Sequence, residues 1–244
     1  MERRVALITG GARGIGRATA LALAEKNWDI AVCYRTSADD AADLVAQVEA
    51  KGVRGIAFQC DVSDHDAAAE MVQALEEKWG RIDALINGAG PYHRVGILKE
   101  SLEGWHSMFD NNLHPVFYLC RLVAPSMQKR KWGRIINFSM ANAHKLQSNP
   151  MVTGHYIAKV GILVLTRTFA KVFAKHGITV NTISPGFIDS KSAPQEELDA
   201  MKSKIPAGYI GDVQDAVGTI LHLLSDEARY VNGTNIQISG AWGL

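Results

Sequence analysis

The stretch TGGARGIG, residues 9–16, decides the fold of this chain. It follows a short apolar run at residues 5–9 and leads into an amphipathic segment that begins near Ile15. Glycines in such a place let the chain turn tightly and bring backbone N–H groups close to a pyrophosphate at a helix N-terminus. A glycine-rich string alone is a weak signal, but its position between a strand and a helix is the context that a dinucleotide-binding turn requires.

Outside this stretch, short apolar runs alternate with longer amphipathic segments. In residues 67–79 the apolar side chains recur at intervals of three and four, which predicts a helix with one buried face. Repeated strands and helices, with near-continuous apolar strands, predict an α/β fold whose parallel sheet is covered on both faces. The predicted strands are 5–9, 29–34, 54–60, 84–87, 134–139, 179–183 and 236–238, and the predicted helices include 15–24, 41–51, 67–79 and 213–224.

No linker or low-complexity stretch interrupts this pattern, so residues 1–244 are expected to form a single domain. The segment 188–211 is different, because it is polar, contains Pro194 and Pro206, and follows a Pro-Gly turn. It is interpreted either as a plain surface excursion or as a lid over a site at the strand ends, where open α/β sheets bind ligands. The lid is favoured, because long insertions in compact domains tend to be functional.

The composition excludes several classes of function. The 26 Lys and Arg residues balance 25 Asp and Glu residues, and a net charge of +1 gives no field that favours nucleic acid or an anionic membrane. The chain shows no secretory signal and no apolar segment of membrane-spanning length, so a cytoplasmic location is expected. Cys33, Cys60 and Cys120 lack CxxC spacing and are interpreted as buried thiols, and the eight histidines show no paired ligand spacing, so no metal is expected.

Six motifs occur in an order that resembles the short-chain dehydrogenase/reductase family, and together they span nearly the whole chain. They are TGGARGIG (9–16), CDVSD (60–64), INGAG (86–90), NNL (111–113), SPGFIDS (184–190) and YVNGTNIQISGA (230–241). The resemblance implies a single-domain, doubly wound (Rossmann) parallel sheet of about seven strands with helices on both faces, and a nicotinamide cofactor. Members closest in pattern reduce 3-oxoacyl thioesters or small ketones and sugars, and nothing in the sequence selects among these substrates.

The same resemblance implies four groups of cofactor-binding residues. In chain order they are a pyrophosphate turn of Gly10, Gly14, Ile15 and Gly16, an adenine contact by Asp61 and Val62, an adenosine wall of Asn87, Ala89 and Gly90, and a carboxamide contact by Pro185, Gly186, Ile188 and Ser190. The sequence departs from the family's Asn-Asn-Ala-Gly at Gly88. This departure bears on local support of the strand rather than on cofactor binding.

The ribose end of the expected site favours NADP over NAD. Enzymes that prefer NAD tend to place an acidic residue after the second strand to hold the ribose 2′-hydroxyl. This chain has Arg35 there and Arg13 inside the glycine turn, and Asp39 and Asp40 lie too far along to take the acidic residue's place. Two guanidinium groups suit a 2′-phosphate, which they can bind with charge-assisted paired hydrogen bonds. The alternative is that both arginines are solvated surface residues.

The residues expected to carry the chemistry depart from the family pattern at the proton donor. In that pattern a tyrosine lies four residues before the lysine. Counting back four from Lys159 reaches His155, and Tyr156 lies one residue later. Asn112 keeps the family's asparagine, which helps to carry a proton relay from the lysine. The expected catalytic group is therefore Asn112, His155, Tyr156 and Lys159, and Lys159 would also contact the cofactor.

A second departure affects the family's catalytic serine, whose position falls on Met140. Side chains alternate between faces along a strand, so the neighbouring Ser139 should point away from the side of Met140. Asn142, His144 or Ser148, in a loop that is slightly longer than usual, could take over the donor role of the serine.

Three interpretations of the proton donor remain open. In the first, a π-bulge turns Tyr156 into the pocket, where Lys159 lowers the pKa of the phenol. In the second, His155 acts as a neutral imidazole that donates a hydrogen bond to a carbonyl. In the third there is no turnover, and the protein is a non-catalytic NADP-binding regulator or scaffold. Altered catalysis is favoured, with hydride passing from NADPH to a carbonyl and His155 or Tyr156 supplying the proton.

The segment 161–174 bears on assembly. It is apolar nearly all round, whereas a helix with one face in water would show a polar stripe, so it is expected to be covered on both sides. In the family the same helix packs against a partner subunit, so a homo-oligomer, either a tetramer or a dimer, is favoured. The alternative is a monomer in which other helices cover it.

Overall fold

A seven-stranded parallel sheet runs through the computed structural model, which describes residues 3–190 and 195–243. In the order β3-β2-β1-β4-β5-β6-β9, the strands are Gly55–Gln59, Asp29–Tyr34, Val5–Thr9, Ala84–Asn87, Gly133–Phe138, Ile178–Pro185 and Asn235–Ile238. The strand order reverses direction between β1 and β4, which places a topological switch point there.

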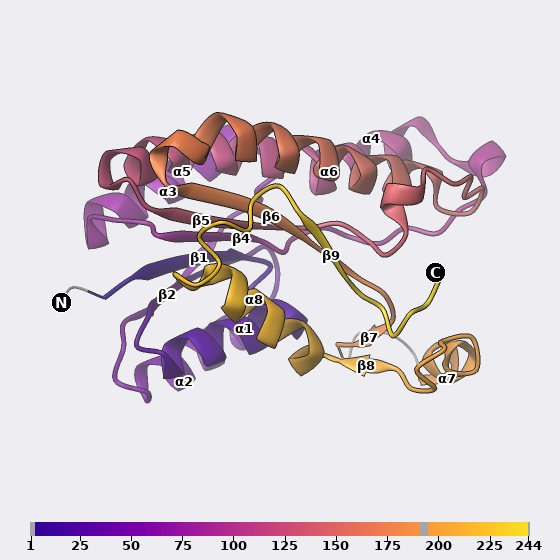
Figure 1. The fold of residues 1–244 in the computed structure, drawn as a ribbon, viewed down its shortest axis with the longest axis horizontal. Helices are drawn as coiled ribbons and strands as arrows, with labels where there is room; N and C mark the ends of the chain where they lie inside the picture. The colour runs from indigo at the N-terminus through magenta and orange to yellow at the C-terminus, as the bar shows by residue number, and fades with distance from the viewer. Residues whose placement is uncertain (1–2, 191–194, 244) are drawn as a thin grey trace.

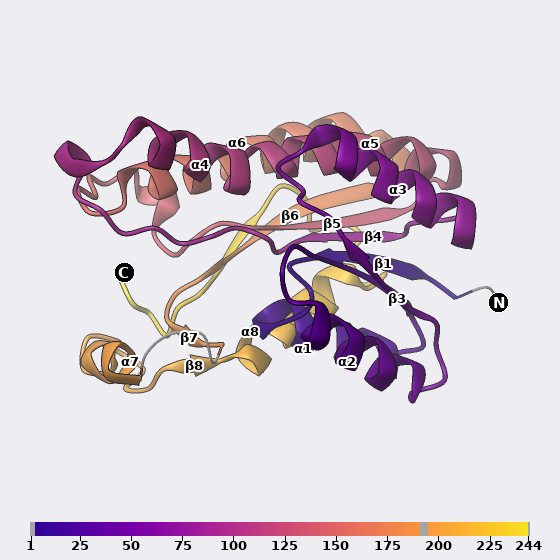
Figure 2. The ribbon, with the colours of Figure 1, turned by 180° about the vertical axis from the view of Figure 1, so that it is seen from behind.

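Helices cover both faces of this sheet (Figures 1 and 2). Below the sheet in Figure 1 lie α1 (Gly14–Glu25), α2 (Ala38–Glu49) and α8 (Val213–Leu224). Above it lie α3 (His65–Trp79), α4 (Leu102–Asn112), α5 (His114–Arg130) and α6 (Thr153–Phe173). Two clusters of buried apolar side chains fill the space between the sheet and these layers. The predicted doubly wound α/β fold is confirmed.

The predicted elements differ from the observed ones mainly where polar residues begin or end an element. The strand β6 runs to Pro185, two residues beyond the prediction, because Ser184 and Pro185 pair with β9. The helix α2 begins at Ala38, three residues before the predicted start, with Asp39 and Asp40 in its first turn. An apolar pattern does not detect such a turn, because acidic residues there are stabilised by the helix dipole rather than by burial.

The described parts of the segment 188–211 lie beyond the carboxyl ends of the strands (Figure 1). Its described elements are β7 (Ile188–Asp189), α7 (Gln195–Lys202) and β8 (Gly211–Asp212), and β7 pairs with β8 in parallel. Residues 191–194, between β7 and α7, lie outside the described residues. The interpretation of the segment as a lid therefore stays a prediction.

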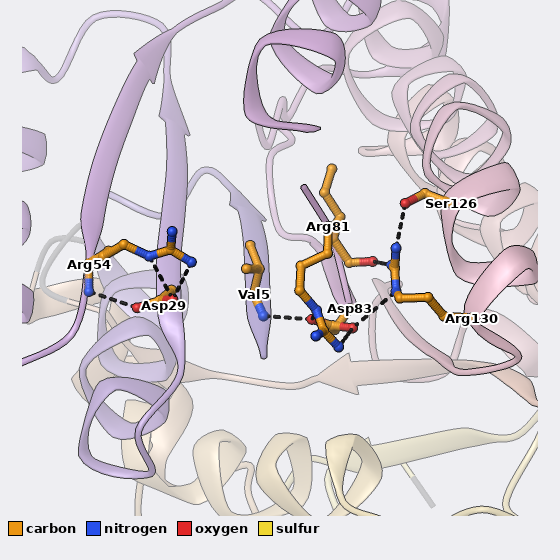
Figure 3. A network of polar contacts seen from close by, with 8 residues as sticks. Val5, Asp29, Arg54, Arg81, Asp83, Ser126 and Arg130 are labelled. Atoms are coloured by element: carbon orange, nitrogen blue, oxygen red, sulfur yellow. Dashed lines mark hydrogen bonds and ion pairs between the residues drawn. The ribbon is translucent and has the colours of Figure 1, made fainter. Parts of the chain in front are cut away.

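At the amino ends of the strands, two buried aspartates join neighbouring elements (Figure 3). Asp29, the first residue of β2, accepts hydrogen bonds from the backbone N–H of Arg54 at 2.8 Å and from its guanidinium at 2.7 and 2.9 Å. Asp83, just before β4, accepts from the backbone N–H of Val5 at 2.8 Å and from Arg81 Nε at 2.7 Å. These contacts fix the edge of the sheet opposite the switch-point cleft.

Three further observations concern classes of site. The cysteines Cys33, Cys60 and Cys120 are free and buried, as predicted. Within residues 3–190 and 195–243, there is no grouping of three or more His, Cys, Asp or Glu side chains that could bind a metal ion. In the same part of the chain, none of the helices is both long enough and apolar enough to cross a membrane.

Candidate active site

A cleft of about 1150 Å³ opens at the switch point between β1 and β4. Open α/β sheets bind ligands at such a place, outside the carboxyl ends of the strands. Most of the predicted cofactor contacts line it, namely Gly10, Arg13, Gly14, Ile15, Gly16, Arg35, Asp61, Val62, Ala89, Gly90 and Ser190. The fold thus brings to one cleft residues that the sequence places up to 180 positions apart.

The glycine turn presents backbone rather than side chains to the cleft. Gly10 has φ +63° and Gly14 has φ +54°, in the left-handed region that favours glycine. A Cβ at Gly16 would lie 2.7 Å from the carbonyl oxygen of Gly10, so α1 packs against the turn only without a side chain there. The first N–H groups of α1 lack helical partners and carry partial positive charge, so the turn can hold an anionic group such as a pyrophosphate.

The two arginines predicted at the ribose end are both in the cleft, and each meets an aspartate. Arg13 contacts the Oδ2 atom of Asp40 with Nε and Nη2, both at 2.5 Å. Arg35 Nη1 lies 3.6 Å from Asp61 Oδ2 and donates to Asn111 Oδ1 at 3.2 Å. The predicted ribose end of the cleft therefore carries paired charges of both signs.

Asp40 is a residue of this cleft that the sequence did not predict as part of the site. It lies six positions beyond the last residue of β2, which seemed too far to reach the ribose. The first turn of α2 folds back over the cleft and brings Asp40 into its lining. The sequence signal was the acidic pair Asp39 and Asp40, five and six positions after the last residue of β2, and whether it reaches the cleft depends on where α2 begins.

Asp61, predicted to contact the adenine, is held by its neighbours. Its Oδ1 atom accepts hydrogen bonds from the backbone N–H of Ser63 at 3.0 Å and from the Ser63 hydroxyl at 2.7 Å. Partial burial is the largest single influence on the pKa of Asp61, and it raises this pKa. The two hydrogen bonds from Ser63 and the charge of Arg35 together outweigh it, so the pKa lies below its ordinary value. Asp61 is therefore an ionised acceptor at neutral pH.

Asn87, predicted in the adenosine wall, is buried and belongs to a chain of polar contacts inside the domain. It donates to Asn137 Oδ1 at 2.8 Å, Asn137 donates to the Thr166 hydroxyl at 2.9 Å, and the Thr182 hydroxyl reaches Thr166 at 2.7 Å. These residues come from β4, β5, α6 and β6. Asn87 thus connects the loop of Ala89 and Gly90 to α6, which carries Lys159, and does not line the cleft.

Lys159 is buried beside Gly90. Its Nζ atom donates to the carbonyl oxygen of Phe138 at 3.1 Å, and a Cβ placed on Gly90 would lie 3.4 Å from it. Burial lowers the pKa of Lys159 to about 8. Ser139 donates to the carbonyl oxygen of Lys159 at 2.8 Å, so its hydroxyl is engaged with the backbone of α6. Lys159 is charged at neutral pH but gives up its proton more readily than an exposed lysine.

His155 and Asn112 converge on the neighbouring Pro91. Asn112 Nδ2 donates to the carbonyl oxygen of Pro91 at 3.2 Å, and its Oδ1 atom is buried without a hydrogen-bond partner. Burial first, and then Lys159, lower the pKa of His155 to about 4, against an opposing hydrogen bond with the Pro91 backbone. The ring packs edge-on against Tyr92 at 5.3 Å, and its Nδ1 atom has no partner. His155 is therefore neutral at pH 7.

Tyr156 is held in a different place. Its hydroxyl accepts a hydrogen bond from the backbone N–H of Gln147 at 2.9 Å and lies 3.2 and 3.3 Å from the carbonyl oxygens of Asn142 and Ala143. The segment Thr153–Phe173 is α-helical throughout, so no π-bulge turns the phenol toward Lys159. The structure brings together Asn112, His155 and Lys159, and it places the Tyr156 hydroxyl in the loop of residues 142–147.

The loop after β5 contains the residues that could replace the family's serine. His144 and Ser148 are exposed, whereas Asn142 is buried. The backbone N–H of Asn142 donates to Gln237 Oε1 at 3.0 Å, and its side-chain Oδ1 atom is buried without a partner. Of the three candidates, Asn142 is therefore the one fixed in the protein interior.

The residues predicted to contact the nicotinamide carboxamide lie on the chain that leaves β6. Pro185 ends this strand, Gly186 follows it and Ile188 begins β7, and these three residues lie outside the lining of the cleft. Ser190 lines the cleft, and a Cβ on Gly14 would lie 3.2 Å from the Cβ of Ser190. The segment after β6 thus returns to the glycine turn and bounds the cleft on that side.

Comparison with known proteins gives consistent matches along the chain. A family model described as "Enoyl-(Acyl carrier protein) reductase" matches residues 10–242. The 3-oxoacyl-[acyl-carrier-protein] reductase of Staphylococcus epidermidis is 37% identical over 239 residues, which are 96% of this chain and 97% of the relative. The reductase of the same name from Synechocystis is 36% identical over 241 residues, which are 98% of this chain and 97% of the relative.

Two solved structures share the fold over more than nine tenths of their length. The NADPH-dependent 3-quinuclidinone reductase from Rhodotorula rubra has a TM-score of 0.92 and 29% identity, and the match covers 100% of this chain and 92% of that one. A putative short-chain alcohol dehydrogenase from Sinorhizobium meliloti has a TM-score of 0.91 and 30% identity. The match covers 99% of this chain and 97% of that one.

Proposed function

Since the chain belongs to the short-chain dehydrogenase/reductase family, we propose that it is an NADP(H)-dependent oxidoreductase that acts on a small carbonyl or alcohol substrate. One observation carries the proposal: Asn112, His155 and Lys159 meet at the Gly90–Pro91 peptide, and Gly90 lines the dinucleotide-sized cleft. We place this activity in the cytoplasm, with no nucleic-acid or membrane partner.

The residues present fit a nicotinamide dinucleotide. The side-chain-free turn around Gly16 and the start of α1 suit a pyrophosphate, and the cleft is long enough to extend from Asp61 to Ser190. Arg13 and Arg35 at the ribose end support NADP(H), since guanidinium groups bind phosphate with charge-assisted hydrogen bonds. The bound nicotinamide would supply the hydride.

Proton handling falls to the chain's own residues. In place of its hydrogen bond with the Pro91 backbone, a neutral His155 can donate its one ring N–H to a substrate carbonyl oxygen, as neutral imidazoles do in other active sites. The charged Lys159 beside it favours the negative charge that develops on that oxygen. Asn112 holds the Pro91 carbonyl, and its own Oδ1 atom is a buried acceptor that no protein donor occupies. His155 is favoured over Tyr156, whose hydroxyl is engaged with the loop of residues 142–147.

Turnover of NADPH with a panel of small ketones and 3-oxoacyl thioesters tests this proposal. His155→Phe should lower kcat by about 10²-fold or more, the usual contribution of a general acid, while the dissociation constant for NADPH stays within about twofold. Tyr156→Phe is the matched control, and it should keep kcat within about threefold. Loss of turnover in Tyr156→Phe with normal turnover in His155→Phe would reverse the assignment of the donor.

A second candidate function is a non-catalytic NADP-binding regulator. It is favoured by the hydrogen bonds of Ser139 and Tyr156, which engage both hydroxyls near the expected family positions with backbone groups. Such a protein would bind NADPH but oxidise it with no carbonyl compound, and Lys159→Met would alter binding alone. An enzyme would lose turnover in Lys159→Met and in Asn112→Ala.

We further propose that the protein assembles as a homo-oligomer, a tetramer or a dimer. In the single chain, Val164 and Val172 on α6 are exposed by 58% and 52%, and Phe117 on α5 by 38%. These side chains add apolar surface to the outer side of two packed helices, and a second copy of the same surface would cover it.

A further inference from the structure

Three arginines surround the ribose end of the cleft, and an aspartate neutralises each of them. Besides Arg13 with Asp40 and Arg35 with Asp61, Arg17 Nη2 lies 2.5 Å from Asp43 Oδ2. The cluster therefore has almost no net charge. A 2′-phosphate, which bears up to two negative charges, enters this cluster without the attraction that unpaired arginines would exert.

Asp40 differs from the other two aspartates in the way it holds its arginine. Both Nε and Nη2 of Arg13 contact the same carboxylate oxygen of Asp40, so the edge of the guanidinium that binds an oxyanion in paired fashion is already used. The Asp40 backbone carbonyl also accepts from Arg17 Nη1 at 3.0 Å, which fixes the first turn of α2 against α1. Asp40 and Asp61 both line the cleft, and Asp40 is the one that contacts Arg13.

The two nicotinamide cofactors place different groups beside this pair. A 2′-phosphate would compete with the Asp40 carboxylate for Arg13 and would be repelled by it at short range. A ribose 2′-hydroxyl can instead donate to the same carboxylate and leave the ion pair intact. Asp40 therefore acts against NADP(H) and not against NAD(H).

We propose that Asp40 is a specificity-determining residue, which competes with the 2′-phosphate for Arg13 and keeps the preference for NADPH over NADH below that of a site with two free arginines. The inference rests on the proposed use of a nicotinamide dinucleotide. It predicts that NADH is accepted at a measurable level. It also predicts that the Asp40 carboxylate controls the ratio of kcat/KM for NADPH to kcat/KM for NADH.

The ribose end can be tested without turnover by titrating the full chain with 2′,5′-ADP and with 5′-AMP in a calorimeter. Asp40→Asn should tighten binding of 2′,5′-ADP about three- to fivefold, the upper part of the range for an exposed charge pair, and leave 5′-AMP within about twofold. Asp39→Asn is the matched control, because it removes the same charge from the same helical turn at an exposed side chain outside the cleft lining. It should change neither affinity by more than about twofold.

A double variant shows whether Asp40 acts through Arg13. In an Arg13→Gln background, Asp40→Asn should improve binding of 2′,5′-ADP less than in the unaltered chain, because the competition for the guanidinium is gone and only the direct repulsion by the carboxylate is relieved. The ratio of kcat/KM for NADPH over NADH should rise in Asp40→Asn by the same factor as the affinity for 2′,5′-ADP.

Two results would overturn the inference alone. Weaker binding of 2′,5′-ADP by Asp40→Asn would mean that Asp40 orients Arg13 for the phosphate, and equal gains in Asp40→Asn and Asp39→Asn would mean that only net charge matters. If the unaltered chain bound neither 2′,5′-ADP, 5′-AMP nor either dinucleotide, the proposed function would fail and the inference with it.

Discussion

Lys159 and His155 are two basic side chains about one helical turn apart on α6, both buried near the Gly90–Pro91 peptide. Burial disfavours the charged form of each, and the two groups oppose each other's protonation. Folding therefore buries the charged Lys159 at a cost in free energy, at the place where the proposed chemistry needs a positive charge. Perturbed titration of this kind is typical of functional sites, and it also makes stability depend on pH in a defined direction.

The first prediction concerns Lys159. Its pKa is about 8 in the folded protein and 10.5 as a free side chain, so between these pH values the unfolded chain binds the extra proton and stability rises with pH. Below pH 8 the charged lysine costs at most about 3 kcal/mol, from a difference of about 2.5 pKa units. Lys159→Met should raise the free energy of unfolding at pH 7 by a part of this amount, reduced by the lost hydrogen bond to Phe138.

Urea unfolding of Lys159→Met and the unaltered chain at pH 7, 8, 9 and 10 measures this effect. The advantage of the variant should shrink as the pH rises above 8. Lys171→Met, at an exposed position of the same helix, is the control and should show no such trend. A constant difference across this range would show that Lys159 titrates in the fold as it does in the unfolded chain.

The second prediction concerns His155. Its pKa is lowered from 6.5 to about 4, so as the pH falls through this window the unfolded state takes up the proton first and stability is lost. The loss approaches about 3 kcal/mol at pH 4. His155→Gln should lose less stability between pH 6.5 and pH 4 in the same urea experiment, and His106→Gln, at an exposed position, should behave like the unaltered chain. Parallel curves for His155→Gln and the unaltered chain would contradict the assignment.

At the scale of elements, the amino ends of β1 and β4 are joined by a side chain rather than by the ladder alone. Asp83 accepts from the first residue of β1 and from Arg81, and Arg130 Nε on α5 lies 3.5 Å from its Oδ1 atom (Figure 3). The exposed fraction of the Asp83 side chain is 1%, whereas that of Arg81 is 20%. One buried carboxylate thus holds together two strands and a helix.

The third prediction is that Asp83→Asn lowers the free energy of unfolding by about 2–3 kcal/mol, because it leaves partly buried arginines without their counter-ion. Chemical denaturation at pH 7 gives the value. Glu25→Gln removes a carboxylate from the more exposed pair with Lys51 and should cost less than about 1 kcal/mol. Equal losses in the two variants would show that burial does not distinguish the pairs.

At the scale of the whole molecule, the layers leave apolar side chains outside the fold. The segment 161–174 was expected to be covered on both sides, and in the single chain its inner side packs on the sheet and on α5 while Val164 and Val172 stay exposed. A helix that is apolar on both sides and covered on one is typical of a surface that associates. The proposed homo-oligomer follows from this arrangement.

The fourth prediction tests that assembly. Val164→Glu should shift the protein toward smaller species in light scattering coupled to size exclusion, because the charge would be buried in the contact between copies. Ala46→Glu, at an exposed position on α2 on the opposite side of the sheet, adds the same charge and should leave the mass unchanged. A monomer in the unaltered chain, or an unchanged mass in Val164→Glu, would exclude this surface.

The sequence by itself determined the sheet, its helices and the position of the cleft at the switch point. These depend on local patterns: apolar strands, three- and four-residue spacing in helices, and glycines at a strand–helix junction, each of which acts over a few residues. The order of the motifs then identified the family, and most of the cofactor contacts that the family implied line the cleft.

The tertiary structure alone decided where the hydroxyl of Tyr156 lies and what neutralises Arg13. Tyr156 and His155 are adjacent in the sequence but lie in different surroundings, because the Tyr156 hydroxyl forms hydrogen bonds with the backbone of residues 142–147. The path of that loop cannot be predicted from a local sequence pattern. Asp40 reaches Arg13 because α2 begins three residues before the apolar pattern does. Both depend on contacts between segments that are distant along the chain, and such contacts are set by packing and charge in three dimensions rather than by periodicity.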